Sequence, residues 1–106
     1  MMQDEFRAIL AKRIALHPED YIQTEVCWNE EISLLIANID ETVGFIRNEC
    51  TDDELAWMSE IFDDIAAKVR NTDFIAAIEE RLSNIHDDEQ RHSIMAGLKY
   101  AKPYLV

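Results

Sequence analysis

The chain has 106 residues, 48% of them hydrophobic, with two glycines, two prolines and a formal net charge of −12. This length fits one domain, and the hydrophobic content excludes an intrinsically disordered chain. Sheet proteins need many turns, and turns use glycine and proline, so we expect an all-α fold in a single helical domain over residues 1–106. Such a negative charge repels nucleic acid and anionic membranes and attracts basic proteins.

The first half of the chain is predicted to form two helices. Apolar residues at helical spacing indicate a first helix over residues 3–16, which a proline ends. A longer second helix is expected from about Ile22 or Val26 to Arg47. We expect it to be bent, or to be preceded by a short turn near Thr24.

The second half begins with a helix start that the sequence marks clearly. Thr51-Asp-Asp-Glu54 is a capping box, and its carboxylates favour the positive end of the helix dipole. We therefore expect a third helix over residues 51–70. Its predicted core face is Leu55, Met58, Phe62, Ile65 and Val69, with Ile61 at the edge.

Two further helices are predicted after residue 70. Thr72 is a plausible N-cap for a fourth helix, and Asp87 or Asp88 for a fifth that ends at Pro103. Their expected inward residues are Phe74, Ile75, Ile78, Leu82 and Ile85, then Ile94, Met95, Leu98 and Ala101. The whole pattern predicts a compact bundle of four to five antiparallel helices.

Residues that could support catalysis or metal binding are few. Glu89 and His92 have the carboxylate-x-x-His spacing of helical di-iron sites, but such sites need two pairs and further glutamates. Cys27 and Cys50 are 23 residues apart and are expected to be reduced, apolar-like thiols. We expect no catalytic residue, no metal and no cofactor, and we expect that the protein is not an enzyme.

The chain also lacks the usual marks of export or membrane insertion. Its first residues contain no basic segment followed by an apolar run, and no apolar run reaches the roughly 18 to 20 residues that cross a bilayer. We therefore expect a cytoplasmic protein.

The negative charge is concentrated in the middle of the sequence. Residues 19–50 contain eight acidic and one basic residue, and residues 51–70 contain six acidic and two basic ones. Residues 1–18, in contrast, sum to +1, and residues 86–106 sum to zero. Acidity that serves solubility alone is one interpretation. The block arrangement favours the other, a surface for a basic partner.

The third predicted helix carries the best candidate for that surface. Glu60, Asp63 and Asp64 lie at i, i+3 and i+4, where like charges oppose a helix, and the capping box does not explain them. Trp57 flanks this acidic ridge, and tryptophan often anchors protein interfaces. The alternative for Trp57 is packing on an adjacent helix. We predict that these four residues bind a partner.

A weaker candidate of the same kind lies on the second predicted helix. There Trp28 is followed closely by Glu30 and Glu31. These two glutamates are added to the predicted partner-binding set.

The run ELAWMSEIFDDIAAKVRNTDFIAAIEERL and the ending YAKPYL give the chain a family resemblance over about residues 51–105. It resembles the small bacterial immunity proteins encoded beside toxins of contact-dependent growth inhibition and related polymorphic toxin systems. It does not have the paired-tyrosine signature of the immunity proteins of DNase colicins. The resemblance implies a cytoplasmic protein that binds and neutralises one cognate toxin domain. Such toxins are often nucleases, whose surfaces are basic because they bind phosphate.

A second functional class fits the same residues. An acidic helical adaptor or regulatory protein for another protein partner, including a DNA-mimic inhibitor, would show the same charge and fold. The sequence does not fix the oligomeric state.

Overall fold

The computed structural model describes residues 1–105, and these residues form helices and no strand. Two short 3₁₀ helices, η1 and η2, accompany seven α-helices. Their bounds are α1 Met2–Ala15, α2 Tyr21–Ala37, α3 Ile39–Asn48, α4 Asp52–Met58, η1 Ser59–Ile61, α5 Phe62–Val69, α6 Thr72–Leu82, α7 Asp88–Ala101 and η2 Lys102–Leu105. The all-α class is confirmed. The predicted number of helices is too low because two of the predicted helices are each broken once.

The long second helix is interrupted at Asn38, and no turn precedes it near Thr24, which lies inside α2. The Asn38 side chain accepts a hydrogen bond from the Glu41 amide and so caps α3. The Thr42 hydroxyl donates to the carbonyl oxygen of Leu35 at 2.6 Å, so a carbonyl near the end of α2 keeps a partner. The helix axis can therefore change direction here at little cost.

The third predicted helix is broken at η1. Ile61, at φ −120° and ψ 9°, lies outside the α-helical region, and α5 begins at the next residue. The capping box at the start of α4 is confirmed, since the Thr51 hydroxyl accepts from the Glu54 amide and the Glu54 carboxylate accepts from the Thr51 amide. The break at η1 changes which way the acidic side chains after it point.

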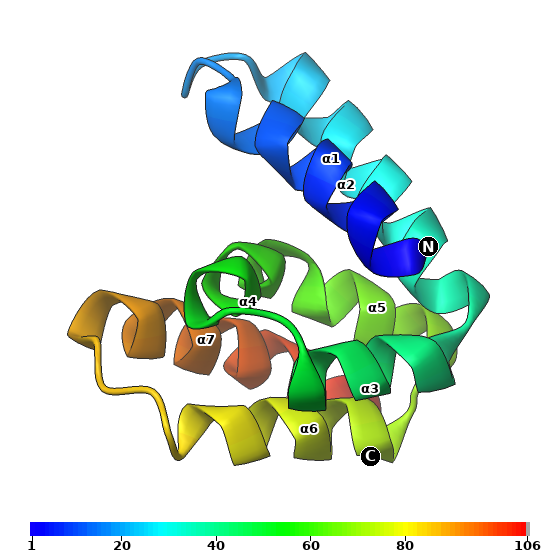
Figure 1. Cartoon of the computed structure of the whole chain (residues 1–106), viewed down its shortest axis with the longest axis vertical. Coiled ribbons are helices and arrows are strands. Elements are labelled where there is room, and N and C mark those ends of the chain that lie inside the picture. The colour runs from blue at the N-terminus through cyan, green and yellow to red at the C-terminus, as the bar shows by residue number, and fades with distance from the viewer. Residues whose placement is uncertain (106) are drawn as a thin grey trace.

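Helices α1 and α2 form an antiparallel hairpin that packs against the remaining helices, α3 to α7 (Figure 1). We call these remaining helices the body. The near part of α1 is buried against the rest of the molecule at Met2, Phe6 and Leu10, and further along the helix Arg13 reaches the body through Glu60. Ile14 and Val26 belong to the apolar pattern of the first two predicted helices, yet they lie in the far half of the hairpin and are exposed, as are Tyr21 and Ile22. The far end of the hairpin therefore presents apolar side chains to solvent.

The core runs through the body and the near half of the hairpin. Leu55, Met58, Phe62 and Ile65 are completely buried, as the third predicted core face requires, and Ile61 is buried with them. The fourth and fifth predicted faces are confirmed at Phe74, Ile75, Ile78, Ile85, Ile94, Leu98 and Ala101. Met95 was predicted to face the core and is exposed instead.

The starts of α6 and α7 are set by side-chain caps. Asn71, and not Thr72, caps α6 by accepting from the Phe74 amide at 3.0 Å. Asp87 caps α7 by accepting from the Gln90 amide at 2.9 Å. None of the described helices is long and apolar enough to cross a membrane.

Candidate functional site

Arg13 of α1 connects the hairpin to the body at a cluster of two tryptophans and two glutamates. Its guanidinium group donates to both carboxylate oxygens of Glu60, at 3.1 and 2.6 Å. The guanidinium carbon lies 5.2 Å from the ring centre of Trp57 and 5.9 Å from that of Trp28. A cation between two aromatic rings and paired with a carboxylate fixes all four side chains.

Glu31 of α2 is the buried acid of this cluster. It is 2% exposed, and burial raises its pKa to about 7, with a further increase from the nearby Glu60 and a decrease from Arg13. The indole nitrogen of Trp28 is also buried, and it has no hydrogen-bond partner among the described residues. The interior of the cluster therefore holds polar groups that are not fully satisfied.

The structure places the six predicted partner-binding residues in three different settings. Glu60 was expected to have no structural role, and this expectation is wrong because Glu60 pairs with Arg13. Glu31 is buried and cannot form part of an exposed acidic face. Trp57 is half-buried: it packs against the core and also faces Arg13.

The remaining three predicted partner-binding residues are Asp63, Asp64 and Glu30. Because α5 starts at Phe62, Asp63 and Asp64 lie in its first turn, where the helix dipole favours carboxylates. Asp63 and Asp64 therefore stabilise the start of α5, a structural role that the sequence analysis did not predict. Asp64 is exposed, and partial burial and the neighbouring Asp63 raise its pKa. Glu30 is exposed on α2.

Two cavities open on either side of Trp57 and Glu60. The first, about 350 Å³, lies between α4 and α7 and is lined by Asp53, Glu89 and Gln90 in addition to the shared pair. We call it the acidic cavity. No lysine or arginine lines it. Its walls are therefore negative.

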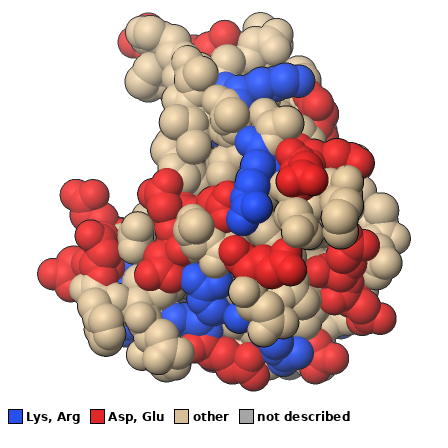
Figure 2. Space-filling model, viewed as in Figure 1, with Lys and Arg blue, Asp and Glu red and all other residues tan. Residues whose placement is uncertain are grey.

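The second cavity, about 440 Å³, lies between the far end of the hairpin and the α4–η1 segment. It is lined by Ile14, Tyr21 and Trp28, together with Arg13 and the shared Trp57 and Glu60. We call it the aromatic cavity. Figure 2 shows the outline of the molecule hollowed below the hairpin end, with acidic side chains gathered on the body beneath the hollow.

Sequence reasoning found Trp57 but missed its neighbours Arg13, Ile14 and Tyr21. These come from the hairpin, 30 or more residues away along the chain, so no local pattern connects them to Trp57. One signal was present: Ile14 and Tyr21 flank the turn of a short helical hairpin, a place where a small body leaves side chains uncovered.

The arrangement is suited to binding, and no group of three or more His, Cys, Asp and Glu among the described residues is placed to hold a metal ion. Glu89 lines the acidic cavity, whereas His92 does not, so the two do not act as a pair there. No protein-family model, no curated protein and no solved structure matches this chain.

Proposed function

We propose that this chain is a bacterial immunity protein that binds a cognate toxin domain, basic and of the nuclease type, through its acidic surface. The distribution of charge carries the proposal. Among residues 1–105, half of the ten Lys and Arg side chains form ion pairs with Asp or Glu: Arg7–Glu54, Arg13–Glu60, Arg47–Glu80, Arg81–Asp52 and Lys102–Glu79. These pairs engage only five of the 22 acidic residues. The acidic excess therefore stays available to an external basic surface.

Trp57 supports the proposal as an anchor beside this charge. Its position is fixed by Arg13, so little side-chain entropy is lost when a partner covers it. Within the predicted set, Glu30, Asp63 and Asp64 act as direct contacts, while Glu60 and Glu31 hold the cluster together.

Capture and protection test the proposal. The tagged chain is used to isolate its partner from the strain that encodes it, and the captured domain is then expressed in a bacterial host with and without the chain. We expect the domain alone to stop growth and the chain to restore it. A captured partner that is harmless to the host would favour the acidic adaptor or regulatory protein instead.

A charge-reversed variant tests the contact residues. Asp63→Lys with Asp64→Lys is expected to weaken binding of the captured toxin by about tenfold or more. Asp40→Lys with Asp73→Lys changes the net charge equally at first-turn positions of other helices and serves as the control. Equal weakening by both variants would count against Asp63 and Asp64. Glu60 is left unchanged because a lysine there would face Arg13 and disturb the fold.

A further inference from the structure

We infer that the acidic and aromatic cavities together dock one basic amphipathic segment of the partner. A lysine or arginine side chain enters the acidic cavity, and a neighbouring apolar side chain enters the aromatic cavity. This inference rests on the proposed function, because it takes the partner to be a basic protein. It assigns the binding mode and the chemistry of the segment that is bound.

Charge complementarity selects the occupant of the acidic cavity. Asp53 and Glu89 come from α4 and α7, both are exposed, and neither forms an ion pair among the described residues. A cationic side chain in this cavity would face both of them and Glu60 as well. The carboxylates are not gathered as a metal site requires, so donors on a long side chain fit them better than a bare ion.

The aromatic cavity selects an apolar side chain. Ile14 is 47% exposed and Tyr21 is 76% exposed there, and an inserted apolar group would cover both. Arg13 already lies in the wall of this cavity, where its charge repels a second cation. The acidic cavity therefore favours a cation and the aromatic cavity an apolar group, and their positions on either side of Trp57 and Glu60 set the orientation of the bound segment.

The wall between the cavities is held in place before binding. Trp57 and Glu60 form that wall, and Arg13 contacts both, by stacking and by a two-point ion pair. Preorganised walls lose little entropy on binding, which favours a specific site over diffuse attraction.

The test uses a synthetic amphipathic helical peptide that contains only leucine and lysine. Its length is about 18 residues, because shorter isolated helices are only marginally stable in water. Its binding to the full chain, labelled with nitrogen-15, is followed by nuclear magnetic resonance. We expect the largest shifts at the Trp57 indole N–H and at the Tyr21 and Glu89 amides. A leucine–glutamate peptide and a serine–lysine peptide are expected to leave these signals nearly unchanged.

Matched pairs of variants locate the cation. Asp53→Asn with Glu89→Gln removes two carboxylates from the acidic cavity. Asp40→Asn with Asp73→Asn removes two carboxylates that do not line the cavity. The two pairs are matched, because each of the four residues is exposed and is the second residue of its helix. The first pair of changes is expected to weaken peptide binding by about tenfold and the second by less than about threefold.

A second pair of variants locates the apolar contact. Ile14→Ala removes a side chain that lines the aromatic cavity, whereas Ile22→Ala removes one that is 77% exposed and does not line it. We expect roughly fivefold weaker peptide binding for Ile14→Ala and no change for Ile22→Ala.

Two results with the peptide would overturn the inference, and a third with the toxin would do so too. One is equal weakening by the two carboxylate pairs, which means that attraction is diffuse. The other is binding of the serine–lysine peptide as tight as that of the leucine–lysine peptide. Protection against a captured toxin that survives Asp53→Asn with Glu89→Gln would also overturn it, while leaving the proposed function intact. Docking of the peptide as expected, with no toxin captured, would instead support the site and count against the immunity function.

Discussion

Glu31 is a buried acid at the centre of the joint between hairpin and body. Three physical causes raise its pKa: burial, the largest, removes water from the carboxylate, and the nearby charges of Glu60 and Glu30 repel it. Arg13 lowers the pKa of Glu31 but is already paired with Glu60. The neutral form of Glu31 is therefore favoured in the folded protein.

This raised pKa makes a prediction about stability and pH. The folded pKa, about 7, lies above the ordinary value of 4.5, so the folded protein holds this proton more tightly than the unfolded chain does. The resulting stability is fully present below pH 4.5 and is lost as pH rises to about 7, a change on the order of 3 kcal/mol. Glu31→Gln, which cannot ionise, should be more stable than the parent at pH 8 and similar to it at pH 5.

Urea denaturation at the two pH values measures this difference. Glu25→Gln is the control, because Glu25 lies on the same helix but is exposed and does not contribute to the raised pKa of Glu31. Parallel pH profiles for the parent and Glu31→Gln would show that the Glu31 side chain is not held neutral.

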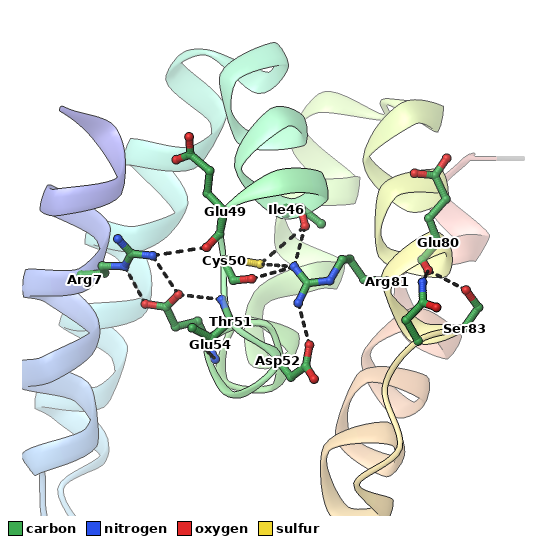
Figure 3. A network of polar contacts seen from close by, with 11 residues as sticks. Arg7, Ile46, Glu49, Cys50, Thr51, Asp52, Glu54, Glu80, Arg81 and Ser83 are labelled. Carbon is green, nitrogen blue, oxygen red and sulfur yellow. Dashed lines mark hydrogen bonds and ion pairs between the residues drawn. The ribbon is translucent and has the colours of Figure 1, made fainter.

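At the scale of elements, Arg81 of α6 connects the end of α3 to the start of α4 (Figure 3). Its guanidinium group donates to the carbonyl oxygens of Ile46 and Cys50, at 2.8 and 2.7 Å, and to the Asp52 carboxylate at 2.6 Å. The Ile46 carbonyl is among the last of α3, which have no partner within the helix. One side chain thus satisfies a helix end and fixes the turn that follows it.

Arg81→Met is expected to lower the free energy of unfolding by about 2 to 4 kcal/mol, because two carbonyls and a carboxylate lose a partly buried donor. Arg47→Met removes the more exposed pair with Glu80 and should cost less than about 1 kcal/mol. Chemical denaturation of the two variants provides the comparison. Equal costs would mean that Arg81 contributes only a surface ion pair.

The two glycines give a second prediction about elements. A Cβ at Gly97 of α7 would lie 2.7 Å from Phe62 and 2.8 Å from the Ser59 carbonyl oxygen, so α7 needs glycine to approach η1 and α5. A Cβ at Gly44 of α3 would meet nothing within 4 Å. Gly97→Ala should lower the free energy of unfolding by about 1 to 3 kcal/mol, whereas Gly44→Ala should raise it by about 0.5 to 1 kcal/mol.

Melting temperatures test both changes in one experiment. Both substitutions improve helix propensity equally, so a difference between them reports on packing. We therefore expect the melting temperature to fall for Gly97→Ala and to rise for Gly44→Ala. A rise in melting temperature for Gly97→Ala would show that α7 can move away from η1 without loss.

At the scale of the whole molecule, the net charge of −12 opposes the compact state. We expect the melting temperature to rise by several degrees as sodium chloride increases from about 20 mM to about 500 mM, because salt screens the surplus repulsion. Association with a basic partner should weaken over the same range. A melting temperature that falls with salt would mean that the surface ion pairs outweigh the repulsion between carboxylates.

The sequence by itself determined the helical class, the capping box at Thr51 and most of the buried faces. These depend on neighbours within about four residues, and that is the range over which helix periodicity and capping act. Asn38 followed by Glu41 was also a readable cap signal, and it marks the break that separates α2 from α3.

The tertiary structure alone decided what the acidic residues do. Glu60 pairs with a cation 47 residues away, and Glu31 is buried because α1, α2 and η1 meet around it. The aromatic cavity exists because the hairpin extends past the body on which it packs, whereas the acidic cavity lies where α4 and α7 come together, between Asp53 and Glu89. Such contacts depend on how helices pack across long separations in the chain, and no local pattern of residues specifies that packing.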